Sequence, residues 1–312
     1  MENQNQKTFL LIDAHSLIHR AYHALPDLRT KDGFKTNAAY GFLLLLFKAI
    51  KDFQPDFVAA AFDLPAPTFR HKYFKEYKAT RPKTPEDLSN QIPLVKEILR
   101  ALKIPIYETE GFEADDVIGT ICAKLVKEPC LTTIILSGDL DVLQLTSSKI
   151  KVFTPKRGLK ETILYSEKEV KERYQLEPFQ LADFKALCGD HSDNIPGVKG
   201  IGFKTATQLI KDFGSIENLY QEIEANSPKS QLLKEALKEK LINNKDQVFF
   251  SKVLATIKKD LELDFQIEKN VFGDYDKKKI EELFKKWEFQ SLINRLPQLK
   301  PKEKILTSLS LF

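Results

Sequence analysis

Short apolar runs in the first half of the chain predict buried strands. They lie at residues 9–12, 57–62, 133–136 and 150–153. Apolar residues recur at helical spacing over 39–53, 84–102 and 114–125. Thr84 and Pro85 suit the cap and first position of the second of these helices, and Pro93 predicts a kink or restart within it. Strands that alternate with helices favour a parallel α/β sheet.

From about residue 167 onward the pattern of apolar positions is helical. Helices are predicted at 170–174, 178–188, 205–213, 231–253 and 277–296. We therefore expect an α/β core over residues 1–176 and a helical region over 177–298. Residues 299–312, which are rich in Lys and Ser, are expected to form a flexible tail.

Acidic residues follow the predicted strands. Seven stand at or just after an extended segment: Asp13, Asp63, Glu113, Asp115, Asp116, Asp139 and Asp141. Three of them belong to GFEADDVIGT, where no Lys or Arg occurs between residues 111 and 123. Any one of these acids is also explained by turn chemistry or by a helix start. Together they are expected at one edge of the sheet, because the carboxyl ends of parallel strands meet there.

Such a set of carboxylates cannot share one site as bare anions near pH 7. Their donors are all oxygen, which favours Mg²⁺ or Mn²⁺ over zinc. Carboxylates that hold two such ions about 4 Å apart serve phosphoryl chemistry. One ion activates a water, and the other stabilises the leaving oxygen.

Residues 68–83, TFRHKYFKEYKATRPK, interleave cations with aromatic rings. Phe69, Tyr73 and Tyr77 are spaced to share one helix face, and Lys78 and Arg81 to share another. With further cations such as Arg70, this pattern suits a single strand of nucleic acid through phosphate neutralisation and base stacking. The alternative is a solvated amphipathic helix whose rings pack on the sheet.

Residues 189–207, GDHSDNIPGVKGIGFKTAT, predict a helix–hairpin–helix turn. A dinucleotide-binding loop is the alternative, but no strand is predicted before it. Glycines, lysines and a helix start would meet a phosphate here, through Gly197, Lys199, Gly200, Gly202, Lys204 and Thr205. Such a turn contacts the backbone of a duplex without reading its sequence. Asp190 and Asp193 lie in the same segment and bring the acidic set to nine.

Composition agrees with a polyanionic substrate. The net charge is +4, but setting the nine acids aside leaves 35 of 44 acidic residues against 48 Lys and Arg. A basic body around an acidic, metal-filled pit suits a nuclease. The longest apolar run, residues 42–47, is too short to span a membrane, and the polar start is no signal peptide. Three cysteines without a CxxC pair indicate free thiols and a cytoplasmic location.

Motifs along nearly the whole chain resemble the 5′-nuclease domain of bacterial DNA polymerase I, within the flap endonuclease family. They are LLIDAHSLIHRAYHAL, AYGF, AAFDLPAPTFRHKYFKEYKATRPKTPEDL, GFEADDVIGT, LSGDLDVLQL, GDHSDNIPGVKGIGFKTA and WEFQSLINRL. The resemblance implies a PIN-like parallel sheet flanked by helices, a helical gateway over about 66–102 and a helix–three-turn–helix element over about 183–214.

The resemblance also implies an activity. It is two-metal hydrolysis with two or more Mg²⁺, which Mn²⁺ replaces, where a 5′ single strand meets a duplex. Substrates would include RNA-primed strands, and the work would be primer removal, replication and repair by a monomer.

The resemblance further implies residue roles. The first metal site would take Asp13, Asp63, Glu113, Asp115 and Asp116. The second would take Asp139, Asp141, Asp190 and Asp193. Lys78 and Arg81 would contact the scissile phosphate, and Tyr22 and Tyr77 would each stack a base. Carbonyls of Val198 and Ile201 would bind K⁺. Because Glu113 and Asp115 serve the metals most clearly in the family, the EADD segment is expected to start outside regular helix.

Two departures from the family pattern leave the acids intact: Leu140 stands where Lys is frequent, and His191 fills a variable position. The complete acidic set disfavours a DNA binder that has lost hydrolysis, and the glycine hairpin disfavours a PIN-type ribonuclease. The polymerase would continue far beyond this chain, so a free-standing nuclease and an excised domain are both open. The ending SLSLF resembles a sliding-clamp-binding peptide, through Ser308, Leu309, Leu311 and Phe312; a frayed apolar tail is the alternative.

Overall fold

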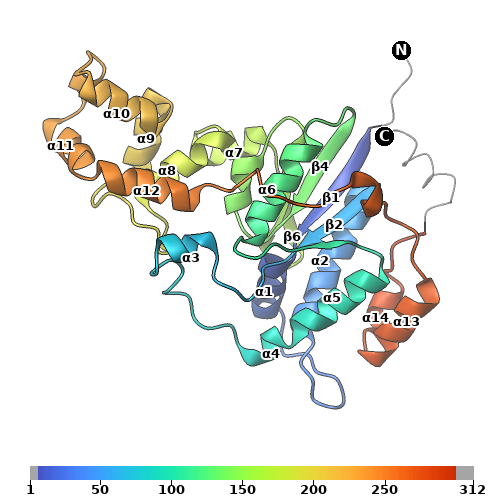
Figure 1. Ribbon diagram of the computed structural model, residues 1–312. Helices are drawn as coiled ribbons and strands as arrows, with labels where there is room; N and C mark the ends of the chain where they lie inside the picture. Colours follow the sequence, from blue (N-terminus) through green and yellow to red (C-terminus); the bar gives the residue numbers. More distant parts are fainter. Residues whose placement is uncertain (1–5, 300–312) are drawn as a thin grey trace, which may run out of the picture.

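The computed structural model describes residues 6–299. Its centre is a sheet of six strands in the order β3-β2-β1-β4-β5-β6 (Figure 1). The strands are β1 (Lys7–Asp13), β2 (Phe57–Ala61), β3 (Ile106–Tyr107), β4 (Leu131–Leu136), β5 (Ile150–Arg157) and β6 (Glu161–Tyr165). All neighbours are parallel except β5 and β6. The predicted parallel α/β core is confirmed, and β6 is an addition that the sequence pattern did not reveal.

Helices cover both faces of the sheet, because alternate strand residues point to opposite sides. Leu10 and Ile12 face a core built with α1 (Ala14–Ala24), α2 (Asn37–Phe53), α5 (Gln91–Ala101), α13 (Lys277–Lys286) and α14 (Gln290–Ile293). Phe9 and Leu11 face the opposite core, built with α6 (Ala114–Leu125), the 3₁₀ helix η1 (Asp141–Leu145) and a crossing segment that includes Ile257 and Leu261. Among the described residues, no helix is long and apolar enough to cross a membrane.

The helical region extends to one side of the sheet and has its own apolar core (Figure 1). It contains α7 (Glu167–Tyr174), η2 (Pro178–Gln180), α8 (Leu181–Cys188), α9 (Phe203–Phe213), α10 (Ile216–Glu224), η3 (Ser230–Leu232), α11 (Glu235–Asn243) and α12 (Lys245–Ala255), and η4 (Ile267–Asn270) follows. The single helix predicted at 231–253 is therefore two helices that meet at Asn244. The helix predicted at 277–296 divides likewise into α13 and α14.

The basic and aromatic strip is not one helix. The helix α3 (Phe69–Tyr73) is short, and turns follow it; Lys78 has φ of 56°. The expected stack of Phe69, Tyr73 and Tyr77 on one helix face is wrong, because the chain turns and buries Tyr77 to 3% exposure.

The next predicted helix, 84–102, starts later than its cap residues indicated. Pro85 is the N-cap of α4 (Glu86–Ser89), so the predicted cap at Thr84 is wrong. The predicted restart is confirmed: α5 begins at Gln91 and holds Pro93 in its first turn, where a missing N–H costs little.

Candidate active site

Three strand ends, those of β1, β2 and β4, bring carboxylates to one edge of the sheet, and the third leads to Asp139 and Asp141. Asp13 ends β1 and caps α1, where its side chain accepts hydrogen bonds from the Ser16 N–H (3.3 Å) and the Ser137 hydroxyl (2.6 Å). Asp63 follows β2 and accepts the Ala114 N–H at 2.7 Å. Chain order runs outward from β1 in both directions, so this edge is the switch point where α/β sheets bind ligands.

The carboxylates at this edge repel one another. Burial and the charges of Asp13, Asp139 and Asp141 raise the pKa of Asp115 well above its ordinary value. Burial also raises the pKa of Asp13 to about 6, against the hydrogen bonds from its two serines. Burial and Asp139 raise the pKa of Asp141 to about 7. Within residues 6–299, the Asp115 side chain has no hydrogen-bond or ion-pair partner. Either a bound proton or a bound cation would relieve the repulsion at Asp115.

Asp116 has a different role from its neighbour. Both of its oxygens accept from the Arg70 guanidinium, at 2.6 and 2.9 Å, and both also accept backbone N–H groups, from Glu113 and Lys258. Asp116 is 0% exposed and Arg70 is 2% exposed. The expected metal contact of Asp116 and DNA contact of Arg70 are therefore corrected to a buried ion pair. The segment is not without a basic neighbour, since Arg70 reaches it from α3.

Glu113 lies where the EADD segment enters the helix. It is the N-cap of α6 with extended backbone, so the expectation that the segment starts outside regular helix is confirmed for Glu113, while Ala114 already begins the helix. Its carboxylate accepts from Lys78 at 2.7 Å and from Arg70 at 3.3 Å. The Tyr77 hydroxyl lies 3.1 Å from the same carboxylate.

Asp193 of the hairpin loop contacts several residues of the basic and aromatic strip, residues 68–83. Arg81 donates to its carboxylate at 2.5 Å, and the Tyr77 hydroxyl lies 3.0 Å away. The Lys78 N–H also donates to the Asp193 carbonyl. Lys78 and Arg81 thus lie beside the acids, and their contact with the scissile phosphate stays a prediction. Tyr77 is fixed between Glu113 and Asp193, so its predicted base stacking is corrected to a structural role.

A basic residue that the sequence interpretation missed lies among the acids. Lys185 of α8 contacts both Asp141 and Asp190, the latter at 2.6 Å. Although burial opposes ionisation, Lys185 and Ser192 hold the pKa of Asp190 at about 2. The signal in the sequence was a lone lysine in the apolar stretch LADFKALC.

The donor chemistry fits a hard divalent ion, since every acid of the set offers oxygen and, within residues 6–299, Asp115 has no ion-pair partner. The side chains as they stand do not close around one: within residues 6–299, no group of three or more His, Cys, Asp or Glu side chains is placed to hold a metal. Side-chain cations of the protein pair with these acids instead: Lys78 with Glu113, Arg81 with Asp193, and Lys185 with Asp141 and Asp190.

The glycine hairpin lies between α8 and α9. A β-carbon at Gly197 would lie 2.3 Å from backbone atoms of Cys188 and Gly189. The close packing of the chain at this point therefore explains the glycine without any contact to a phosphate. Gly200 has φ of 85°, in the left-handed region, and Gly202 is open and caps α9. Lys199 and Lys204 are exposed, and Thr205 lies in the first turn of α9.

Other predicted contacts of the hairpin lie deeper or come from elsewhere. Val198 and Ile201 are each 3% exposed, and the Val198 carbonyl accepts the Ile201 N–H. Lys240 of α11, which the sequence did not single out, adds a third ammonium group, 2.9 Å from where a β-carbon at Gly200 would lie.

Tyr22 is engaged within the protein. Its hydroxyl donates to Asp87 at 2.8 Å, and Lys35 lies 4.4 Å from its ring centre. Lys35 therefore covers one face of the Tyr22 ring. Base stacking by Tyr22 stays a prediction, and the base would have to stack on the other face.

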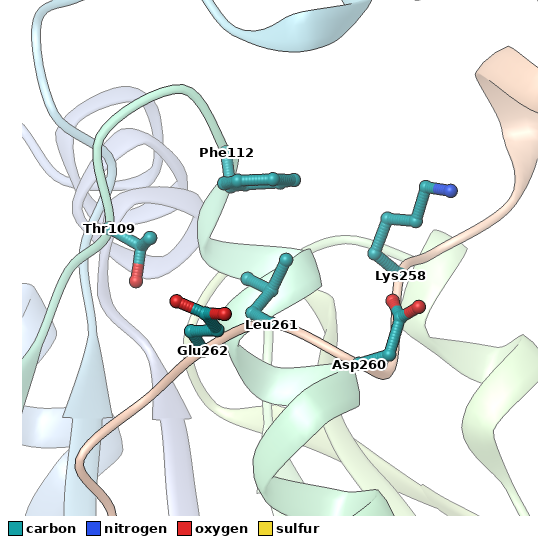
Figure 2. A pocket seen from close by; sticks show the side chains of 6 residues that line it. All are labelled: Thr109, Phe112, Lys258, Asp260, Leu261 and Glu262. Carbon is teal, nitrogen blue, oxygen red and sulfur yellow. The ribbon is translucent and has the colours of Figure 1, made fainter.

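A surface pocket of about 530 Å³ lies behind the EADD segment. Figure 2 shows Phe112 across one side, with Leu261 below it and Lys258 and Asp260 at the rim. None of the nine acids lines it, so it is separate from the acidic edge.

Comparison with known proteins identifies the family of this chain. The chain matches the family described as 5′-3′ exonuclease, N-terminal resolvase-like domain, over residues 8–175. It matches 5′-3′ exonuclease, C-terminal SAM fold, over residues 176–278. The chain belongs to the 5′–3′ exonuclease family, and the predicted family resemblance and fold class are confirmed.

Curated relatives include the DNA polymerase I of Bacillus subtilis, 42% identical over 291 residues, and that of Bacillus caldotenax, 41% identical over 291 residues. Each match covers 93% of this chain and 32% of the relative, so the chain spans about a third of their length.

Solved structures are similar in fold. The flap endonuclease of bacteriophage T5, in a complex with DNA and metal ions, superimposes with a TM-score of 0.63 at 18% identity, over 98% of this chain and 99% of that one. The catalytic core of Rad2 with DNA substrate gives 0.58 at 18% identity, over 99% of this chain and 93% of that one.

Proposed function

We propose that the chain is a Mg²⁺-dependent 5′ flap endonuclease and 5′–3′ exonuclease that hydrolyses DNA by a two-metal mechanism. The observation that carries this proposal is the crowded acidic edge. Among the described residues Asp115 has no hydrogen-bond or ion-pair partner, and the pKa values of Asp13, Asp115 and Asp141 are raised. Membership of the 5′–3′ exonuclease family supports a nucleic-acid backbone as the substrate of this acidic edge. The biological setting proposed is primer removal, replication and repair in the cytoplasm.

The chain's own residues divide the work. Bound at Asp13, Asp63, Glu113, Asp115, Asp139, Asp141, Asp190 and Asp193, the Mg²⁺ ions would supply an activated water and charge stabilisation of the leaving oxygen. Lys78 and Arg81 contact Glu113 and Asp193 and would hold the scissile phosphate beside the acids. Exposed Lys199 and Lys204 would hold the backbone of the duplex beside the hairpin.

Other parts of the proposal rest on the family alone. Mn²⁺ would substitute for Mg²⁺, K⁺ would bind carbonyls of Val198 and Ile201, and RNA-primed strands would be cut as DNA flaps are. The monomeric state is likewise proposed. The clamp-binding prediction for Ser308, Leu309, Leu311 and Phe312 lies outside the described residues and stays a prediction, testable by clamp binding with and without residues 308–312.

One assay tests the central proposal. The protein is incubated with a 5′-flap duplex labelled at its 5′ end, with Mg²⁺ or with chelator, beside a matched single strand and a blunt duplex. We expect cleavage near the junction in Mg²⁺ and none in chelator. Absence of Mg²⁺-dependent cleavage at the junction would sink the proposal. The Asp139→Ala variant should bind the flap duplex and fail to cut it, and full activity in this variant would refute the metal assignment.

A further inference from the structure

A lysine ammonium group lies between two carboxylates of the proposed second metal site. Lys185 reaches out of α8 to Asp141, which follows β4, and to Asp190, which belongs to the hairpin loop. The exposure of its side chain is 18%, and that of the two carboxylates is 22% and 13%. The ammonium therefore joins the sheet edge to the helical region at a largely buried point.

The Lys185 ammonium uses the oxygens that a metal ion would need. Its Nζ contacts Oδ1 of Asp141 and lies 2.6 Å from Oδ2 of Asp190. A divalent ion on the same oxygens would stand beside a like charge at low solvent exposure, where repulsion is strong. Ammonium and metal are therefore alternatives for these two carboxylates.

The proposed first site is different. Asp115 has no ion-pair partner within residues 6–299, and Asp13 is held only by serine hydroxyl and backbone N–H donors. A cation held by Asp13 and Asp115 would displace no protein charge, whereas Glu113 of the same site is already paired with Lys78 and Arg70. The pair Asp13 and Asp115 is therefore open to a metal ion in a way that Asp141 and Asp190 are not.

We propose that Lys185 is an internal competitor for the second metal ion. The first ion binds beside Asp115, and the second binds only when the Lys185 ammonium leaves Asp141 and Asp190. In the metal-free protein the same ammonium is a positioning group that holds the hairpin loop against the sheet edge. This inference rests on the proposed function, because it takes the acidic edge to bind divalent ions.

Direct measurement of Mn²⁺ binding tests the competition without relying on activity. Calorimetry and electron paramagnetic resonance give the number and affinity of Mn²⁺ sites in the full chain without DNA. Removing the ammonium in Lys185→Met should tighten the weaker site by on the order of tenfold, the effect of about one pKa unit of charge interaction. Lys185→Arg keeps a cation and should bind like the wild type. So should Lys168→Met, which removes an equal charge from a side chain that is 78% exposed.

The outcomes separate this inference from the proposed function. Equal Mn²⁺ affinity in the wild type and Lys185→Met, or weaker binding in the variant, overturns the competition while leaving a metal-dependent nuclease intact. A wild type that binds no Mn²⁺ and cuts no flap overturns both.

A second measurement needs no destabilised variant. In wild-type protein with ¹⁵N-labelled lysine side chains, the Lys185 Nζ signal is assigned by its loss in Lys185→Arg. Saturating Mg²⁺ should shift this signal or abolish it as the ion pair opens. A signal that Mg²⁺ leaves unchanged overturns the proposal.

Discussion

At the scale of single residues, the two neighbouring aspartates of the EADD segment show how a counter-charge from elsewhere in the fold decides role. Asp116 is fully buried and its oxygens are satisfied by Arg70 and two backbone N–H groups. Asp115, the preceding residue, has no hydrogen-bond or ion-pair partner within residues 6–299. Sequence spacing revealed the cluster of charge but not this division, because Arg70 is distant in the chain.

The Arg70–Asp116 pair predicts a large stability effect. Arg70→Met keeps the apolar part of the side chain but leaves Asp116 buried and uncompensated. The free energy of unfolding should fall by about 3–5 kcal/mol, as for other broken buried ion pairs. Urea denaturation measures it, with Lys72→Met, an exposed neighbour on α3, as the control. A loss no larger than the control's would contradict the structural assignment and return Arg70 to the DNA-binding candidates.

Asp115 should show the opposite behaviour. Asp115→Asn removes a charge from a crowded set and breaks no hydrogen bond within residues 6–299. Stability in chelator should stay within about 0.5 kcal/mol of the wild type or rise. Flap cleavage in Mg²⁺ should fall on the order of 10²–10³-fold. Single-turnover cleavage and thermal melting measure the two effects. Asp116→Asn, the matched neighbour, should lose stability; a variant of Asp115 that cuts normally would remove it from the metal site.

At the scale of elements, the apolar pattern predicted the centre of the fold best. The helix α6 has the predicted bounds, and four strands lie where apolar runs stood. By contrast, α1 was missed although its buried residues Ala14, Leu17, Ile18 and Ala21 recur at helical spacing, because polar residues dilute the pattern. The edge strand β6 is half exposed and depends on pairing with β5, which periodicity alone does not reveal.

The crossing of α6 by the segment after α12 predicts an unusual glycine effect. Gly119 lies inside α6, where alanine normally stabilises a helix by roughly 1 kcal/mol. Here a β-carbon would meet the Lys258 carbonyl oxygen at 2.4 Å. Gly119→Ala should therefore destabilise the protein by about 1–3 kcal/mol, as overpacking does. Urea unfolding tests this against Gly202→Ser, an open position at a helix cap that should be near neutral. Stabilisation by Gly119→Ala would show that the crossing segment moves aside freely.

At the scale of the whole molecule, the candidate site is built where the α/β core and the helical region meet. Asp193 and Asp190 come from the hairpin loop, and cations of both halves hold them beside the strand ends. Sequence reasoning singled out the acids as candidates, because each has a local signature. It did not find the ion pairs between them, since Lys185 with Asp141 and Arg70 with Asp116 pair only through the fold.

This division of the molecule predicts that substrate binding and cutting separate by position. Lys199→Ala and Lys204→Ala should each weaken binding of a flap duplex and lower the slope of log affinity against log salt by about 0.9, the effect of one lost phosphate contact. Lys240→Ala should do the same, because its ammonium lies at the same turn. Binding is measured in chelator from low to high salt, with Lys168→Ala as a charge-matched control.

Lys78→Ala and Arg81→Ala should instead slow cleavage of bound substrate, since these side chains stand at the acids and not at the hairpin. Single-turnover rates at saturating protein isolate that step. Salt slopes that are the same in wild type, Lys199→Ala and Lys204→Ala would place the duplex elsewhere on the protein. Unchanged single-turnover rates in Lys78→Ala and Arg81→Ala would show that these two cations pair with the acids but do not assist cleavage.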